Sequence, residues 1–414
     1  MTRWPLFLCI LVSFLSPEVI TAAELNHRAG FAMRDVTPSV ASLKANDTYM
    51  GGYGFWTDRG PAESVHDPLE ANAMCLTAPR SSEGMCLAIV DSLGLTGPII
   101  KAIKADVVQR IPLTADQIFI GATHTHAAPD LLGLWGGSPP EYVASLINST
   151  ADSVVSAFEN MRPATLYYSL GEGKAHNRRD WGFTDTTIVV IDAIGDNGLS
   201  LGTFVNFASH PVVSTMDNKS LSSDYVHYLR EKVAEKTGAT VVFANGAIGD
   251  VNPRALREPD MWMSARTYGE AIAEAAISSM KSREPASPGV KVTRIPFTTS
   301  VENTILALAQ FLGIIEEDNS GPPWNLKVAT QLGRIKLGNE VEFVSVPGEA
   351  LTRTGLSIKD NMDMPAEIIL GLTGGSLGYF VPKDEWESGR NDNYEESVSL
   401  GSHLAGQIVQ LLEE

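Results

Sequence analysis

Short apolar runs alternate along the chain with longer segments in which apolar residues recur at helical spacing. The short runs are typical of buried strands, and the longer segments are typical of amphipathic helices. We expect strands at residues 117–122, 187–193, 201–208, 240–244, 341–346 and 367–372. We expect helices at residues 98–110, 141–161, 225–236, 261–280 and 397–413, the third of them after the N-cap candidates 222–224. This alternation predicts an α/β fold, with a mixed β-sheet core flanked by helices.

Two apolar runs on either side of residues 80–83 predict a β-hairpin. A hairpin centred on residues 80–81 places Cys75 directly opposite Cys86. A disulfide between the two strands is then possible in an oxidising compartment. Because free cysteines also behave as small core residues, the alternative is a pair of reduced cysteines, and that is the state we predict.

The first 23 residues have the three parts of a secretory signal peptide. Arg3 supplies a positive charge, residues 5–16 form a short apolar run, and residues 21–23 are small. The run is shorter than the roughly 20 residues that span a bilayer, so an uncleaved anchor is the weaker alternative. We predict an exported protein, secreted or periplasmic, with one domain from residue 24 to 414. The best candidate for a boundary within it is the Ser-Pro-Gly stretch at 287–289.

Composition narrows the range of partners. The 414 residues include 31 Lys and Arg but 49 Asp and Glu, which gives a formal net charge of −18. Recognition of a phosphate backbone requires clustered basic residues, so we exclude nucleic acid as a partner. The 44% hydrophobic and 19% charged residues are typical of a folded globular protein, and membrane contact is expected to be peripheral at most. The sequence predicts no oligomeric state.

Several predicted strands lead into polar residues that can carry chemistry. Among these are His124 and His126, His210, Asn252, Glu349 and Tyr379. In open α/β sheets, ligands bind beyond the carboxyl ends of the strands. We therefore predict one active site at these ends.

The two histidines of the His-x-His sequence after the strand at 117–122 point to a metal. On an extended segment, residues two apart lie on the same face, so His124 and His126 can approach one cation. Alternatively, one imidazole binds the metal while the other moves protons. His210 and Glu349 are the best further ligands, because two histidines and a carboxylate with an open position are typical of catalytic zinc. The simpler alternatives are hydrogen-bonded surface histidines and, for Glu349, a residue of a helical first turn.

At these residues the chain resembles a known family. The ordered strings are GATHTHAAPD, NRRDW, FASHPV, NGAIGDVNPR, SVPGEALTRTG and GLTGGSLGYFVPKDEWE. They resemble the neutral ceramidase family, from about Ala29 to the end of the chain. Members of that family are zinc amidases that cleave the N-acyl bond of ceramide to a fatty acid and a sphingoid base.

The resemblance implies a role for each matching residue. It implies one zinc ion per chain, with the ligands His124, His210, Glu349 and Tyr379. It places His126 beside the reacting centre, and we expect this residue, held close by the His-x-His spacing, to carry the proton to the leaving amine. The Asn-Arg pair of the family matches Asn177 and Arg178, and we expect Arg178 to anchor the polar end of the substrate. A looser match assigns Asp224 to an Asp that follows the second ligand.

The chain also departs from the family pattern. Asn252 stands where the family has a Ser, and Arg179 also replaces a Ser. Asp130 is expected to place a charge near the entrance, and no residues remain for the C-terminal immunoglobulin-like domain of ceramidases. Because an amide is no nucleophile, we predict attack by metal-activated water without an acyl-enzyme, with Asn252 as a donor to the oxyanion. The alternative for Asn252 is a structural residue that turns the loop before Pro253.

The leading hypothesis is thus an exported zinc-dependent amidohydrolase that acts on ceramide-like N-acyl lipids. A second hypothesis keeps the zinc and the hydrolysis but assigns a different amide or ester as the substrate. A third is a metal-stabilised binding protein without catalysis. The partner that we expect is a small-molecule lipid or amide substrate.

Overall fold

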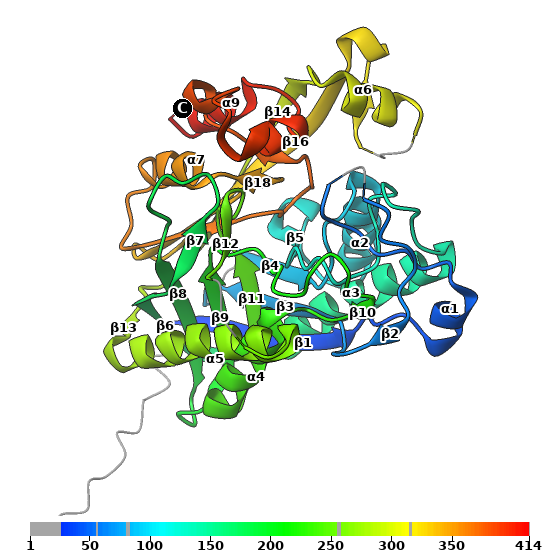
Figure 1. Ribbon diagram of the computed structural model, residues 1–414. Helices are drawn as coiled ribbons and strands as arrows, with labels where there is room; N and C mark the ends of the chain where they lie inside the picture. Colours follow the sequence, from blue (N-terminus) through cyan, green and yellow to red (C-terminus); the bar gives the residue numbers. More distant parts are fainter. Residues whose placement is uncertain (1–25, 55–56, 80–82, 255–257, 314–316, 414) are drawn as a thin grey trace, which may run out of the picture.

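The computed structural model describes residues 26–413, apart from 55–56, 80–82, 255–257 and 314–316 (Figure 1). The expected signal peptide therefore lies outside the described residues, and so does most of the expected hairpin turn. Among the described residues, none of the helices combines the length and the apolar character needed to cross a bilayer.

The larger of two main sheets is mixed. Its strand order is β11-β9-β8-β6-β1-β3-β4-β5, with β13 paired to β6. Along this path the pairs β4–β5 and β9–β11 are parallel and the other pairs are antiparallel. Its strands are β1 (His27–Asp35), β3 (Glu70–Thr77), β4 (Gly84–Val90), β5 (Ile118–Ala122), β6 (Arg162–Glu172), β8 (Thr187–Gly195), β9 (Ser200–Phe207), β11 (Val241–Asn245) and β13 (Glu284–Pro285).

The second main sheet has the order β14-β16-β17-β19, with β15 paired to β16. Its strands are β14 (Val290–Ser300), β15 (Asn319–Ser320), β16 (Lys327–Leu337), β17 (Val341–Ser345) and β19 (Ala366–Leu370). Three short ladders join loops, and they are β2 (Ser64–Val65) with β10 (Ser220–Leu221), β7 (Ala175–Asn177) with β12 (Val251–Pro253), and β18 (Glu349–Ala350) with β20 (Tyr379–Phe380).

Helices cover the outer faces of both sheets. The α-helices are α1 (Val40–Ala45), α2 (Gly97–Arg110), α3 (Pro140–Glu159), α4 (Tyr225–Thr237), α5 (Met261–Ser279), α6 (Thr304–Phe311), α7 (Thr352–Lys359), α8 (Tyr394–Ser397) and α9 (Leu404–Glu413). Short 3-10 helices are η1 (Ala115–Gln117), η2 (Met280–Ser282), η3 (Pro323–Asn325), η4 (Lys383–Glu385) and η5 (Arg390–Asn393).

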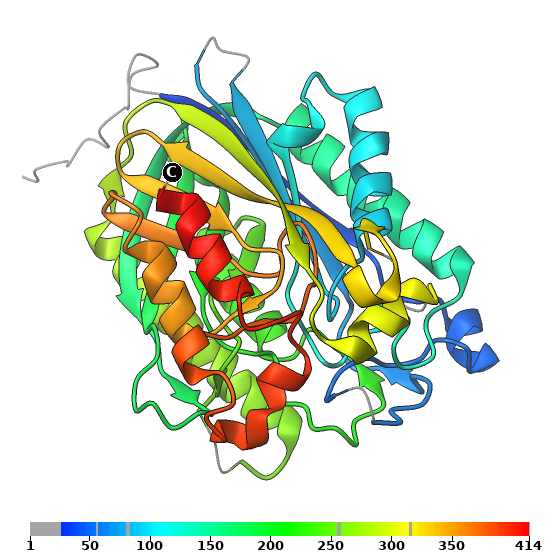
Figure 2. The same cartoon turned by 90° about the horizontal axis from the view of Figure 1, so that it is seen from above.

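The two sheets pack face to face. Residues alternate between the two faces of each strand, so one set of side chains contacts the helices and the other set contacts the second sheet. In β3, Cys75 packs under α2 and α3, while its neighbour Met74 faces the second sheet. Helices α4 and α5 continue the same outer layer over β8, β9 and β11. The far face of the second sheet packs against α6, α7 and α9 (Figure 2). The result is four layers, helix–sheet–sheet–helix, which confirms the predicted α/β class.

The predicted elements match the observed ones within one or two residues, with one exception at the C-terminus. The start of the helix expected at 397–413 is wrong, because α9 covers only Leu404–Glu413. The preceding segment leaves the helix to bond elsewhere. The carbonyl of Leu400 accepts bonds from the backbone N–H groups of Glu302 (2.7 Å) and Asn303 (3.2 Å) at the start of α6. Hydrogen bonds to a distant segment thus replace those that the carbonyl of Leu400 would accept within a helix.

The prediction for the two cysteines was half right. Cys75 and Cys86 lie directly opposite each other in the β3–β4 register, as expected. The prediction of reduced thiols was wrong, because the two residues form a disulfide. This register brings the two side chains close enough to bond, and both are fully buried.

Candidate metal centre

The four predicted zinc ligands reach one place from four segments of the chain. His124 lies just after β5 and His210 just after β9. Glu349 and Tyr379 begin β18 and β20 and lie directly opposite each other in that parallel pair. All four are buried, with at most 7% of any of them exposed. The structure thus brings together residues separated by up to 255 positions in the sequence.

Hydrogen bonds between strand ends hold these segments together. The side-chain amide of Asn245, at the end of β11, donates to the carbonyl of Thr123 after β5. The carbonyl of Asn245 accepts a 2.9 Å bond from the N–H of Gly371, just after β19. A small apolar cluster next to these ends consists of Ala122, Ala208, Ile248 and Leu372. The site therefore lies at the carboxyl ends of the strands, as predicted.

The His-x-His segment is not extended. His124 has a left-handed backbone conformation (φ 65°), which is unusual for a residue other than glycine. The rings of His124 and His126 are almost perpendicular (88°), with their centroids 4.9 Å apart. The two imidazoles do lie together, but the strand alternation used to predict this was the wrong reason. A sharp turn after β5 brings them together.

Backbone carbonyls orient two of the imidazoles. Nδ1 of His124 lies 2.5 Å from the carbonyl oxygen of Leu93, and Nδ1 of His210 lies 3.0 Å from that of Val251. Because a carbonyl only accepts, each Nδ1 must carry the proton, which leaves a lone pair on each Nε2. Both Nε2 atoms point at Oε2 of Glu349, at 3.3 Å for His124 and 3.0 Å for His210.

This arrangement fits a metal cation. Two nitrogen lone pairs facing a carboxylate oxygen repel one another unless a cation or a proton lies between them. Histidine ligands of metals typically donate their other ring N–H to a carbonyl, as His124 and His210 do. The donor set therefore fits a divalent metal, with His124, His210 and Glu349 as the converging ligands.

The electrostatics of the site favour the metal-binding protonation states. Burial lowers the pKa of His210 to about 4 and lowers the pKa of His126 well below its usual range. Burial alone would raise the pKa of Glu349, but a proton on His124 or His210 facing it holds that pKa well below its usual range, and a bound cation would act in the same direction. Neutral imidazoles and an ionised carboxylate are the forms that bind a divalent cation.

His126 is the third imidazole of the site. The potential ligand atoms of His124, His126 and His210 all lie within 4.8 Å of one another, so these three buried histidines are close enough to bind a metal ion. The Nδ1 atom of His126 has no hydrogen-bond partner among the described residues. Tyr53 packs against the ring at 4.7 Å, and Gly52 packs against its edge. His126 is thus held in place by packing, with its Nε2 facing Nε2 of His124 at 3.4 Å.

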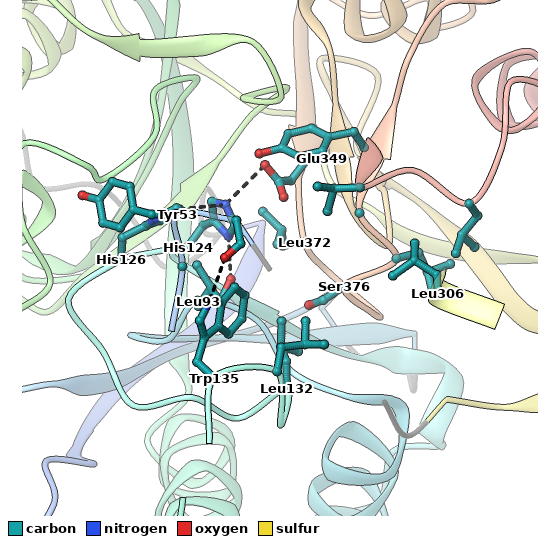
Figure 3. A pocket seen from close by; sticks show the side chains of 18 of the residues that line it. Tyr53, Leu93, His124, His126, Leu132, Trp135, Leu306, Glu349, Leu372 and Ser376 are labelled. Carbon is teal, nitrogen blue, oxygen red and sulfur yellow. Dashed lines mark hydrogen bonds and ion pairs between the residues drawn. The ribbon is translucent and has the colours of Figure 1, made fainter. Parts of the chain in front are cut away.

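The metal centre forms one end of a mainly apolar pocket (Figure 3). In Figure 3, His124, His126 and Glu349 lie together, and Leu306 lies on the far side of Ser376. The apolar lining consists of Leu93, Leu132, Leu134, Trp135, Leu306, Leu372, Leu377, Val398 and Leu400. An apolar pocket with a few polar groups at one end is typical of a binding site for a ligand that has an apolar chain.

Comparison with solved structures assigns the fold. No family model matches the sequence, and no curated protein matches it. Neutral ceramidase from Pseudomonas aeruginosa superposes with a TM-score of 0.77 at 16% identity, over 94% of this chain and 74% of that one. A ceramidase complexed with C2 gives 0.78 at 15% identity over the same shares. The fold is that of neutral ceramidase. The resemblance read from the sequence is thereby confirmed at the level of the fold.

The pocket of this chain holds a second tyrosine, which the sequence did not predict. Tyr394 lines the pocket, and its ring centroid lies 5.9 Å from that of Tyr379. Burial raises the pKa values of both phenols above the usual range, so both are neutral without a metal. Tyr394 follows the irregular 3-10 turn η5, in which residues 391–393 all have left-handed backbones, so no regular strand or α-helix pattern leads to it. The Tyr-Glu sequence after this irregular stretch was the only available signal.

Arg178 lies behind these two tyrosines. Its guanidinium carbon is 5.4 Å from the ring centroid of Tyr379 and 5.6 Å from that of Tyr394. It donates to the carbonyl of Gly249 (2.6 Å) and to Glu395 (2.7 Å). Arg178 is not among the residues that line the pocket. The structure therefore places it where it orients the tyrosines.

Arg179, which replaces a Ser of the ceramidase pattern, has a structural environment. It is 1% exposed and bonds the carboxylates of Glu395 (2.8 Å) and Glu396 (3.0 and 3.1 Å). Together with Arg178, these residues form what we call the arginine cluster, consisting of Arg178, Arg179, Glu395 and Glu396. The cluster holds the segment that delivers Tyr394 to the pocket.

The expectation for Asp130 was wrong. Asp130 is 1% exposed, and its carboxylate accepts four backbone N–H bonds, from residues 132, 133, 135 and 137. It does not place a charge at the entrance, because these bonds turn it into the loop. The folded loop presents Leu132, Leu134 and Trp135 to the pocket.

Asn252 and Asp224 lie outside the pocket wall. Asn252 is in β12, next to the residue whose carbonyl orients His210, and it lines a separate hollow near Pro253 and Asp260. Asp224 is the N-cap of α4 and accepts bonds from the N–H groups of Val213, Ser214 and Tyr225. Neither residue lines the pocket of the metal centre, so a catalytic role for Asn252 stays a prediction.

Proposed function

We propose that this protein is an exported zinc-dependent amidohydrolase that cleaves the N-acyl bond of ceramide-like lipids to a fatty acid and a sphingoid base. The observation that carries the proposal is the convergence of His124 Nε2 and His210 Nε2 on Glu349 at one end of an apolar pocket. The ceramidase fold supports the same class of chemistry. The apolar pocket suits a lipid chain, and the polar end suits its amide.

In this proposal, His124, His210, Glu349 and Tyr379 hold one zinc ion. Nitrogen and oxygen ligands of this kind suit zinc, although such sets also bind other divalent ions. When bound, zinc supplies a Lewis acid that polarises an amide carbonyl and lowers the pKa of a coordinated water to about 7.

The remaining residues position groups and move protons. His126 has a neutral ring whose Nε2 lies 3.4 Å from Nε2 of His124, and it carries the proton to the leaving amine. Arg178 keeps Tyr379 and Tyr394 in place. The two tyrosines then contact the polar end of the substrate, so Arg178 anchors that end indirectly. The apolar walls exclude bulk water from the amide.

We further propose that water attacks the amide directly, without an acyl-enzyme. The ceramidase Ser position is occupied here by Asn252, which is no nucleophile and does not line the pocket. The hydroxyl of Ser376, which does line it, accepts a 3.0 Å bond from the N–H of Leu95. Trapping with hydroxylamine tests this step, because an acyl-hydroxamate would mean that a side chain is acylated.

Export rests on two observations. The first residues have the pattern of a signal peptide. The disulfide between Cys75 and Cys86 is of the kind that persists in oxidising compartments. Mass spectrometry of the secreted or periplasmic protein should find a chain that begins near residue 24, and a cytoplasmic chain that retains Arg3 would contradict export.

Release of fatty acid from labelled N-acylsphingosine tests the main proposal. The purified protein should carry one zinc per chain, release fatty acid, lose activity with a chelator and recover it with zinc. The departure at Asn252 favours testing a wider panel of amides and esters in parallel. Turnover of another substrate alone would support the second hypothesis, and bound metal without any turnover would support a binding protein.

A further inference from the structure

Helix α6 exposes an unusual number of large apolar side chains. Ile305, Leu308, Phe311 and the next residue, Leu312, are 54%, 52%, 55% and 61% exposed. Trp324 of the neighbouring η3, which contacts α6, is 86% exposed. We call these five residues the α6 patch. Single exposed apolar residues are ordinary, but a contiguous group of large ones marks an interaction surface.

The opposite side of the same helix forms part of the pocket wall. Leu306, Ala307 and Gln310 are buried, and Leu306 and Gln310 line the pocket of the metal centre. The spacing of 305, 308 and 312 places these residues on one side of the helix, away from the pocket. The α6 patch and the pocket are therefore separated by one helix, which Figure 1 shows standing out from the body of the molecule.

The charges around the patch decide which surface it fits. Residues 303–313 include no charged side chain. The nearest described charges on either side are Glu302 and Glu317, both acidic like the next residue, Asp318. Glu317 lines the pocket, and Asp318 is paired with Lys101. The whole chain has a net charge of −18. An anionic surface would repel such a protein, whereas a zwitterionic one would not.

We propose that the α6 patch docks on a lipid bilayer with electrically neutral headgroups, so that the pocket takes its substrate from the bilayer surface. Aliphatic side chains with Phe and Trp are the types that enter the boundary between headgroups and acyl chains. The proposal rests on the proposed function in one respect, that the substrate is a lipid. The continuity of the patch with the pocket wall favours a bilayer over a second protein, because a protein partner covering α6 would not bring a lipid to the pocket.

Vesicle binding by the full chain tests the docking directly. The probe is a vesicle of phosphatidylcholine, separated by flotation, and the variant is Leu308→Ser with Phe311→Ser, neither of which lines the pocket. We expect the variant to bind vesicles about tenfold more weakly or worse, because two large apolar side chains no longer enter the bilayer. The matched control is Leu199→Ser, which changes a 64% exposed leucine in the turn between β8 and β9 and should bind like the unaltered protein.

Activity separates failure of the docking from failure of the proposed function. On a water-soluble short-chain N-acyl substrate the patch variant should be as active as the unaltered protein, and on vesicle-embedded substrate it should be about tenfold slower. Equal vesicle binding by the two proteins would overturn the docking, and so would stronger binding to anionic than to neutral vesicles. If light scattering shows a dimer that the variant loses, a second copy covers the patch and the docking is wrong. Vesicle binding through the patch without turnover of either substrate would support the docking and contradict only the proposed function.

Discussion

Two buried polar groups of residues meet at Tyr379, and they differ in how their charges are satisfied. In the arginine cluster, each carboxylate faces a guanidinium, with bonds of 2.7–3.1 Å from Arg178 and Arg179. In the metal centre, by contrast, His124, His210 and Glu349 turn acceptor atoms toward one another. The charges of the first group are paired within the protein, whereas the facing acceptors of the second need a cation or a proton between them.

The difference shows how a buried polar group that supports the fold can be distinguished from one that binds a ligand. A buried charge is costly unless it is paired, so a paired group such as the arginine cluster needs no further partner. A group of facing acceptors stores an unfavourable interaction that a bound cation relieves. Removing a residue of the arginine cluster should therefore lower the free energy of unfolding, whereas removing a residue of the metal centre should abolish activity and leave the fold intact.

The largest expected effect is on activity, in the metal centre. Glu349→Ala and His124→Ala should each lose the zinc and reduce turnover by more than about a thousandfold, because the water then returns toward its ordinary pKa. The fold should survive, since each change removes one of the facing acceptors. Metal analysis and fatty acid release check this, with Leu199→Ser as the control. Full zinc and full turnover in either variant would contradict the ligand assignment.

The arginine cluster should respond in stability instead. Arg179→Met leaves the carboxylates of Glu395 and Glu396 buried without this partner, which should lower the free energy of unfolding by about 3–5 kcal/mol whether or not zinc is present. Adding Glu395→Gln and Glu396→Gln to the same chain should recover part of the loss. Denaturant unfolding measures both, and a loss that depends on zinc would mean that the two groups are not distinct.

Zinc removal should destabilise only a chain with an intact metal centre. At a free zinc concentration about a hundred times the dissociation constant, binding should stabilise the native state by about 2.7 kcal/mol. A chelator should therefore lower the melting temperature of the unaltered protein and leave that of Glu349→Ala unchanged. An equal shift in both proteins would show that zinc acts at another site.

A smaller effect is expected where the packing around His126 is disturbed. A Cβ at Gly52 would lie 2.5 Å from Nδ1 of His126, so Gly52→Ala must displace the ring. Because a general acid typically contributes at least about a hundredfold, we expect kcat to fall up to about a hundredfold while zinc stays bound. Gly137→Ala is the matched control, since that glycine also has a positive φ but its Cβ would meet nothing within 4 Å. Equal rates for the two variants would contradict the proton-carrying role of His126.

The local pattern of the chain determined its elements and named the main residues of the site. The N-cap of α4 at Asp224 and the strands β9 and β11 follow from residues a few positions apart. The strings around His124, His210 and Glu349 indicated the candidate metal ligands for the same reason, because these residues follow apolar strands directly.

Only the tertiary structure decided how these residues are oriented. The carbonyls that set the tautomers of His124 and His210 belong to residues 31 and 41 positions away, and local propensity carries no information over that distance. Tyr394 reaches the pocket because Arg179, 216 positions away from Glu395, binds the segment that holds it. Asp130 became a buried loop organiser because four N–H groups were available to it, whereas the sequence showed only a charge. The identity of a side chain is local, but its partners are set by packing between distant segments.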